Sequence, residues 1–214
     1  MRSSGPIEIK ICGITNRGDA LAAIDCGAHA LGFNLYRGSK RFIDIGSAGE
    51  WISQLGDNVR KVAVMVNPTL EEALQTARLP FVDSLQLHGS ESPEFCRQLA
   101  EKNVSFTKAV PMRNEHSLSQ PTVFSTDSIL LDSSSRSGFG GTGEVFPWSL
   151  AARFVDDHPN FRVILAGGLT PENVAEAIHT VRPAGVDVTT GVELAPGRKD
   201  RARVQAFIAA AANA

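Results

Sequence analysis

The chain has 214 residues, of which 43% are hydrophobic and 21% are charged, as is ordinary for one globular domain with a sizeable core. The net charge of -2 offers no general attraction to nucleic acid or to an anionic membrane, so we expect neither as a partner. No apolar run approaches the roughly 20 residues of a membrane span, and the short polar start of the chain lacks the apolar core of a signal peptide.

Short β-branched runs alternate with longer helical patterns along the whole chain. The runs predict strands at Ile7–Ile11, Ala30–Leu35, Val59–Val66, Ser84–His88, Ser105–Ala109, Ile129–Asp132, Arg162–Ala166 and Gly185–Thr189. The segments between them predict helices at Arg17–Cys26, Ile45–Leu55, Leu70–Thr76, Pro93–Lys102, Arg113–Gln120, Trp148–Asp157, Pro171–Val181 and Asp200–Ala212. Ser92-Pro93-Glu94 and Thr170-Pro171-Glu172 each place a capping hydroxyl before a first-turn proline and an acid.

Strand–helix units that repeat on one sheet predict a single-domain α/β protein, a parallel (β/α)8 TIM barrel. The barrel would span residues 7–214, after a short N-terminal extension at residues 1–6. The predicted strands are mostly continuous apolar runs, as expected when both faces of a sheet are buried. The alternative is an open doubly wound sheet, which usually has fewer strands and a Gly-x-Gly-x-x-Gly turn after the first. Cys12-Gly13-Ile14-Thr15, which follows the first strand, forms no such turn.

Polar residues gather at the carboxyl ends of the predicted strands, where a barrel of this kind carries its active site. They are Cys12, Arg41, Asn67, Gln86, His88, Asp132, Asp187 and Thr189. Strand alternation puts Lys10 and Cys12 on one face. Because the first and last strands of a closed barrel are neighbours, we predict a buried ion pair between Lys10 and Asp187. That pair would place a cation beside Cys12, where it favours a thiolate.

Several of these residues also have a purely structural interpretation. Cys12, Cys26 and Cys96 form neither a metal-binding spacing nor an even disulfide set, which favours a reducing, cytoplasmic setting. A lone cysteine is usually a small buried hydrophobe. His88 can be a capping or packing residue, and Asp132 can cap a turn, although a carboxylate after a buried apolar run is costly unless it is partnered.

Glycine-rich turns follow the last two predicted strands, at Gly167-Gly168 and at Thr190-Gly191. Loops at these positions commonly hold a phosphate in this fold, because glycine lets backbone N–H groups approach an anion closely. Tight turns without a ligand are the alternative. A third glycine-rich segment, Gly138–Gly143, suits either a mobile lid over an active site or a flexible loop.

Together these residues resemble the phosphoribosylanthranilate isomerase family of tryptophan biosynthesis, over almost the whole chain. The resemblance is carried by Lys10-Ile11-Cys12-Gly13-Ile14-Thr15, Leu85-Gln86-Leu87-His88-Gly89, Leu130-Leu131-Asp132, Gly140-Gly141-Thr142-Gly143, Leu165-Ala166-Gly167-Gly168-Leu169-Thr170-Pro171-Glu172-Asn173-Val174, Val186-Asp187-Val188-Thr189-Thr190-Gly191-Val192-Glu193 and Pro196-Gly197-Arg198-Lys199-Asp200. It implies an Amadori rearrangement of N-(5-phosphoribosyl)anthranilate to 1-(2-carboxyphenylamino)-1-deoxyribulose 5-phosphate, with no metal or organic cofactor. In the family's pattern Asp132 is the general acid and Cys12 the general base.

The resemblance also implies a binding site for a small phosphoribosyl substrate. Arg41 matches the arginine that binds the anthranilate carboxylate. The other predicted substrate-binding residues are Gln86, His88 and Asp187, and the predicted phosphate-binding residues are Gly167, Gly168, Thr190 and Gly191. We expect a monomer or a homodimer.

The chain departs from the family pattern at several positions. Pro147 stands where an aspartate is common, Arg37-Gly38-Ser39 replaces Pro-Lys-Ser, Asn34 replaces an apolar residue and Thr189-Thr190 replaces a serine pair. These changes keep the acid and the base, and they leave room for a substituted anthranilate. One alternative is the related histidine-pathway sugar isomerase, alone or as a dual-specificity enzyme; those enzymes use two aspartates as acid and base, so Cys12 in the first position argues against this alternative. The other is a barrel that binds a phosphosugar without turnover.

Overall fold

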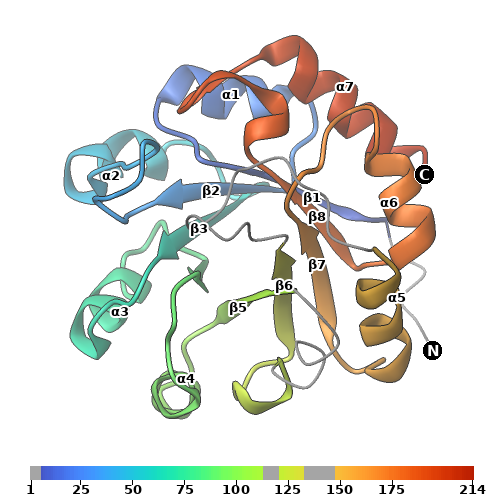
Figure 1. Ribbon diagram of the computed structural model, residues 1–214. Coiled ribbons are helices and arrows are strands. Elements are labelled where there is room, and N and C mark those ends of the chain that lie inside the picture. The colour runs from blue at the N-terminus through green and yellow to red at the C-terminus, as the bar shows by residue number, and fades with distance from the viewer. Residues whose placement is uncertain (1–5, 113–120, 133–147) are drawn as a thin grey trace.

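Eight parallel strands close into a barrel with helices around it (Figure 1). The computed structural model describes residues 6–112, 121–132 and 148–214. The strands, in chain order, are β1 (Glu8–Cys12), β2 (Ala30–Asn34), β3 (Arg60–Met65), β4 (Ser84–Leu87), β5 (Phe106–Pro111), β6 (Ser128–Asp132), β7 (Arg162–Ala166) and β8 (Gly185–Val188). Because β1 pairs in parallel with both β2 and β8, the sheet closes on itself. The predicted TIM barrel is therefore confirmed, and the open doubly wound sheet is excluded.

Helices cover the outside of the barrel (Figure 1). Within the described residues they are α1 (Arg17–Asp25), α2 (Ile45–Ser53), α3 (Leu70–Ala77), α4 (Pro93–Glu101), α5 (Trp148–Asp157), α6 (Val174–Val181) and α7 (Arg201–Ala212). These helices follow the predicted ones closely, except at the start of α6. The helix predicted at Arg113–Gln120 lies outside the described residues.

Helix α6 begins at Val174, later than the predicted start at Pro171. The reason is the side chain of Asn173, which turns back toward β7 instead of capping the helix. Its Oδ1 accepts a hydrogen bond from the Thr170 N–H at 2.8 Å, and its Nδ2 donates to the Gly168 carbonyl at 3.0 Å. The Thr170 hydroxyl accepts a bond from the Glu172 N–H at 3.3 Å. The predicted cap therefore forms a local turn, and the helix starts only after it.

Two other helix starts follow their sequence signals. The Ser92 hydroxyl accepts a hydrogen bond from the Phe95 N–H at 3.1 Å and caps α4, as predicted. At α3, Thr69 and Glu72 form a capping box, in which each side chain bonds to the other residue's backbone. Both caps satisfy N–H groups that the first helical turn leaves without partners.

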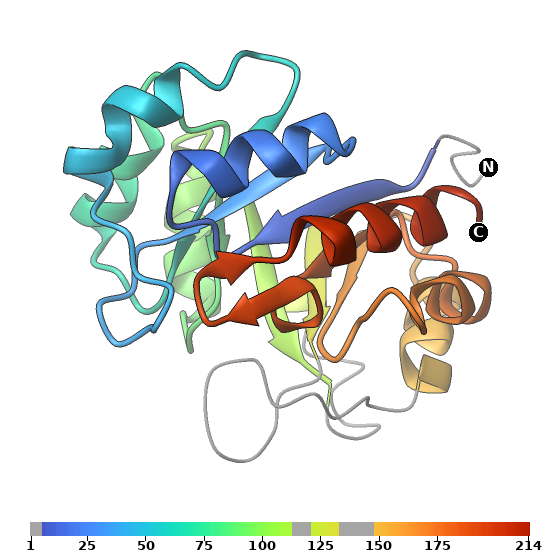
Figure 2. The same cartoon turned by 90° about the horizontal axis from the view of Figure 1, so that it is seen from above.

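A short antiparallel hairpin between β8 and α7 was not predicted. It consists of β9 (Glu193–Ala195) and β10 (Arg198–Lys199), and it follows a single turn of 3₁₀ helix, η3 (Thr190–Val192) (Figure 2). A second 3₁₀ turn, η2 (Pro121–Val123), precedes β6. The hairpin continues from the carboxyl end of β8, so its side chains reach the rim that carries the predicted site.

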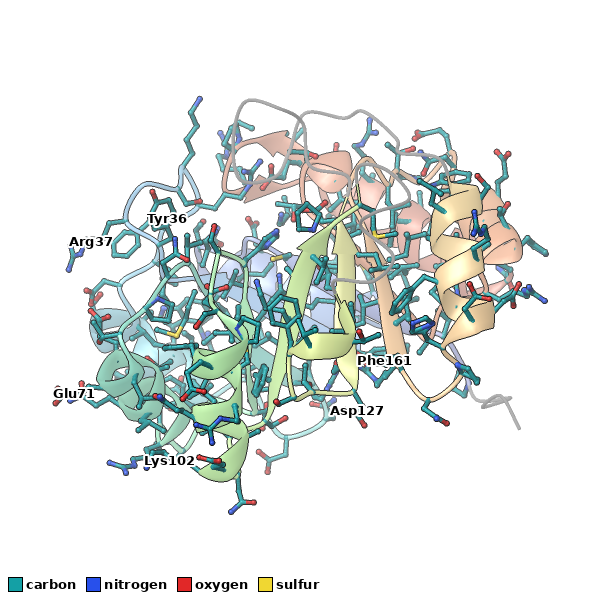
Figure 3. All side chains as sticks on the ribbon, turned by 60° about the horizontal axis from the view of Figure 1, so that its bottom comes forward. Tyr36, Arg37, Glu71, Lys102, Asp127 and Phe161 are labelled. Atoms are coloured by element: carbon teal, nitrogen blue, oxygen red, sulfur yellow. The ribbon has the colours of Figure 1, made fainter. Side chains whose placement is uncertain are left out.

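Strand alternation sorts side chains into two layers. A small cluster of Ala109, Leu130, Ile164 and Ala166 faces the barrel interior, on the same strand faces as Asp132 and Asp187. A much larger apolar cluster lies between the strands and the helices. Figure 3 marks the amino ends of β6 and β7 by Asp127 and Phe161, which precede them, and the strands run from there to the opposite rim. Within the described residues, no helix is long and apolar enough to span a membrane.

Candidate active site

A buried ion pair lies beside Cys12 at the junction of β1 and β8. Lys10 and Asp187 stand opposite each other in the strand register, and Lys10 Nζ lies 3.0 Å from Asp187 Oδ2. Their side chains are only 2% and 6% exposed, so the predicted pair is confirmed as a buried one. Burial by itself lowers the pKa of Lys10, but the charge of Asp187 and contacts with Asp187 and Cys12 outweigh it, and the net shift is upward. Lys10 therefore stays an ammonium group next to the buried Cys12 thiol.

The second oxygen of Asp187 faces a different environment. Within the described residues, Asp187 Oδ1 is buried and has no hydrogen-bond partner. A buried acceptor without a partner costs about 1–3 kcal/mol, so such atoms usually meet a donor from water or a ligand. Asp187 thus binds Lys10 through one oxygen, and its other oxygen is available to a ligand at the carboxyl ends of the strands.

A hydrogen-bonded chain joins the carboxyl ends of β4 and β6. His88 Nδ1 lies 3.3 Å from Gln86 Nε2, and His88 Nε2 lies 3.0 Å from Asp132 Oδ2. An amide NH2 group can only donate, so Nδ1 is the acceptor and the ring proton sits on Nε2. His88 therefore donates to Asp132 Oδ2. The ring uses both nitrogens on rim side chains, so His88 is not simply a packing residue.

Arg41 is held by a carboxylate that sequence reasoning missed. Its Nε lies 2.9 Å and 3.1 Å from Glu193 Oε1 and Oε2, and its Nη2 lies 2.6 Å from Oε2. Lys199 Nζ approaches the same carboxylate, 3.0 Å from Oε1. The bond with Glu193 raises the pKa of Arg41. Burial tends to raise the pKa of Glu193, but the two cations lower it overall, whereas burial lowers the pKa of Lys199.

Glu193 and Lys199 come from the unpredicted β9–β10 hairpin. The hairpin is closed further by the Gly197 N–H, which donates to Glu193 Oε1 at 3.1 Å. Both charged residues lie in segments that carry the family resemblance, and this was the sequence signal that could have marked them as site residues. Their roles were missed because charged residues around a glycine turn ordinarily face solvent.

The loop after β2 positions Arg41 from the other side. Asn34 Oδ1 accepts a hydrogen bond from the Tyr36 N–H at 2.9 Å, and Ser39 Oγ accepts one from the Arg41 N–H at 3.1 Å. A backbone bond of 2.9 Å joins the Ser39 N–H to the Tyr36 carbonyl. Asn34 therefore stabilises the turn that leads to Arg41.

The two glycine turns pack against each other at the ends of β7 and β8. Gly167 and Gly168 both have positive φ values, 86° and 65°, which a residue with a side chain rarely adopts. Gly191, inside η3, lies so close to this turn that an added Cβ would stand 2.0 Å from the Leu169 carbonyl oxygen. Close backbone approach is what a phosphate site at these strands requires.

The described residues thus bring the predicted site together at one rim. Cys12 and Asp187 both lie beside Lys10 at β1 and β8, Arg41 is held by Glu193 from the segment after β8, and Gln86, His88 and Asp132 join β4 to β6. The segment Gly138–Gly143 lies outside the described residues. Residues 6–112, 121–132 and 148–214 contain no group of three or more His, Cys, Asp or Glu that could hold a metal ion.

Comparison with known proteins identifies the family. Residues 9–210 match the family described as N-(5'phosphoribosyl)anthranilate (PRA) isomerase. An N-(5'-phosphoribosyl)anthranilate isomerase from Pelobacter propionicus is 43% identical over 202 residues, which cover 94% of each chain. The phosphoribosyl anthranilate isomerase of Thermotoga maritima superposes with a TM-score of 0.88 at 40% identity, covering 97% of this chain and all of that one.

A further solved structure connects the fold with a ligand. It is a phosphoribosyl anthranilate isomerase in complex with reduced 1-(o-carboxyphenylamino)-1-deoxyribulose 5-phosphate, with a TM-score of 0.85 and 39% identity, covering 97% of this chain and 100% of the other. These matches extend over the barrel and the rim residues alike. The chain therefore belongs to the N-(5'-phosphoribosyl)anthranilate isomerase family.

Proposed function

We propose that this protein isomerises N-(5-phosphoribosyl)anthranilate to 1-(2-carboxyphenylamino)-1-deoxyribulose 5-phosphate in tryptophan biosynthesis, with Asp132 as the general acid and Cys12 as the general base. Family membership over residues 9–210 supports the reaction. The observation that carries the assignment of roles is the pairing of each group with a suitable neighbour. Asp132 accepts a hydrogen bond from His88, and Cys12 lies beside the buried Lys10 ammonium.

The first step is a proton transfer from Asp132 to the ribose ring oxygen. The C1–O bond breaks as the nitrogen lone pair forms the C=N bond of a protonated Schiff base. His88 holds one carboxyl oxygen of Asp132, which leaves the other oxygen to carry the transferred proton. General acid catalysis of this kind contributes about 10²–10⁴-fold to a rate.

The second step is removal of the C2 proton by Cys12. The C2–H electron pair moves toward the Schiff base and gives an enolamine, which then tautomerises to the ketone. The base is best suited to this step as a thiolate, and the Lys10 ammonium compensates that charge. Cys12 takes a proton here and forms no covalent bond to the substrate.

The remaining rim residues would bind the two ends of the substrate. The bidentate contact with Glu193 occupies two of the five N–H groups of Arg41, so others are available for the anthranilate carboxylate. Asp187 Oδ1 is suited to accept a bond from a substrate hydroxyl. Gly167, Gly168, Thr190 and Gly191, in the turns after β7 and β8, are the proposed phosphate seat, while Gln86 and His88 complete the site from β4.

The test is turnover of freshly prepared phosphoribosylanthranilate, followed by the loss of its fluorescence. The parent protein should convert the substrate, and Asp132→Asn should lower kcat by about 10²–10⁴-fold. The matched control is Asp127→Asn, an exposed carboxylate just before the same strand at its other end (Figure 3), which should leave kcat unchanged. An inactive parent protein would refute the enzyme, and equal turnover by Asp132→Asn would refute the acid.

A further inference from the structure

Another buried ion pair lies outside the barrel wall, below the rim at β4 and β5. Lys108 Nζ lies 2.8 Å from Glu91 Oε2, and the two side chains are 3% and 1% exposed. The register neighbours of Lys108, Leu87 and Ile129, belong to the apolar clusters that face the helices, whereas Ala109 faces the barrel interior. Lys108 therefore points toward the helix layer and away from the reacting groups.

Besides a bond of 2.9 Å from Lys108 Nζ to the Ala109 carbonyl, the pair forms hydrogen bonds with the backbone around His88. Lys108 Nζ donates to the Gly89 carbonyl at 2.9 Å and approaches the Leu87 carbonyl at 3.4 Å, so it contacts the residues on both sides of His88. Glu91 Oε1 and Oε2 accept the Gly89 N–H at 3.0 Å and 3.1 Å. The backbone that carries His88 is thus fixed at both neighbouring residues.

The loop after β3 closes the same network. Glu91 Oε1 also accepts the Asn67 N–H at 2.9 Å, and Asn67 Oδ1 accepts the Ser90 N–H at 2.6 Å. An added Cβ on Gly89 would stand 2.4 Å from Asn67 Oδ1 and 2.7 Å from its backbone nitrogen. The loops after β3 and β4 are therefore in direct contact, and the position of His88 is set by three strands together.

We propose that Lys108 and Glu91 are positioning residues that hold His88 in hydrogen-bond contact with Asp132; the proposal rests on the function given above. The contact is 3.0 Å long and joins the ends of β4 and β6, which β5 separates, so a small shift of the β4 loop breaks it. Displacements of about 1 Å by remote changes can cost roughly 10²-fold in rate. Stability alone gives little reason for a charged pair at this place, because apolar pairs of similar volume often serve equally well.

The test replaces the pair as a whole, because removing one charge leaves the other buried without its partner. The double variant Lys108→Met/Glu91→Gln keeps the length of both side chains, and we expect kcat to fall roughly 10- to 100-fold with little change in KM. The matched control is Lys61→Met. Lys61 is also a buried lysine that faces the helix layer, because its register neighbour is Leu31. Its Nζ donates to the Gly56 carbonyl at 3.0 Å. The control should retain both constants.

A double-mutant cycle separates positioning from general loosening of the fold. In a His88→Ala background, replacing Lys108 and Glu91 should lower kcat no further, because the pair acts through His88. Losses that multiply in the triple variant would overturn the proposal, and so would an unchanged kcat in the double variant.

Side-chain ¹⁵N NMR of the histidines gives a readout that does not depend on turnover. The chain has five histidines, and His88→Ala assigns the signal of interest. The Nε2–H of His88 should be a protected, hydrogen-bonded proton in the parent protein and in Lys61→Met, and it should exchange rapidly with water in the double variant. Unchanged protection would overturn the inference even if the parent proved inactive, which would separately refute the proposed function. If this double variant does not fold, Lys108→Met/Glu91→Leu, which also leaves no unpaired charge at the site, carries the same measurements.

Discussion

Replacing Lys10 with methionine separates the stability of the barrel from its chemistry. The substitution keeps the side-chain length but leaves Asp187 buried, 6% exposed, without the cation 3.0 Å away. Breaking a buried ion pair from one side costs about 3–5 kcal/mol. For a chain of this size, each kcal/mol lowers the Tm by about 2–4 °C, so we expect a fall of roughly 6–20 °C.

The assay is thermal unfolding of three proteins: the parent, Lys10→Met and Lys10→Met/Asp187→Asn. The double variant has no unpaired charge at this site, so it should regain most of the lost Tm. It should not regain kcat, because the cation beside Cys12 is still absent. Recovery of kcat together with Tm would show that Lys10 has a structural role only, and a Tm of Lys10→Met equal to that of the parent would refute the burial argument.

The pH dependence of this difference has a definite sign. The pKa of Lys10 in the folded protein is raised above its ordinary value of 10.5, so the stability that the pair contributes is complete below about pH 10.5. It is lost only as the pH rises through the folded-state pKa. The gap in unfolding free energy between the parent and Lys10→Met should therefore not shrink from about pH 6 to pH 9. A gap that shrinks steadily with pH over this range would contradict the raised pKa.

Three further substitutions test the other parts of the rim. Glu193→Gln should raise KM roughly tenfold, because the bidentate bond that orients Arg41 is weakened. Since the pKa of Glu193 is lowered from 4.5, its contribution to stability is present above about pH 4.5 and lost as the pH falls through the folded value, so the stability gap to the variant should vanish in acid. Gly191→Ala should lower stability by about 1–3 kcal/mol and weaken competitive inhibition by inorganic phosphate, because its Cβ would collide with the Leu169 carbonyl; unchanged inhibition would refute the phosphate seat. Cys12→Ala should lower kcat far more than it raises KM, and the reverse pattern would make Cys12 a binding residue.

Much of the architecture followed from local patterns. The alternation of apolar runs and helical segments was sufficient for the strands and for most helix bounds, because backbone hydrogen bonding and burial act over a few residues. Alternation along two strands also sufficed for the Lys10–Asp187 pair, since closure makes the first and last strands neighbours. The start of α6 was predicted wrongly, because the side chain of Asn173 bonds backward to the turn after β7.

The barrel, the polar residues at the carboxyl ends of its strands, and the family resemblance that names an acid and a base could all be inferred from the sequence alone. The tertiary structure alone decided which side chains hold those groups in place. Glu193 contacts Arg41 across 152 residues of chain, and Lys108 contacts the loop of His88 from another strand. Such contacts depend on how far each loop travels and how the strands are staggered in the closed barrel, and no local pattern encodes either quantity.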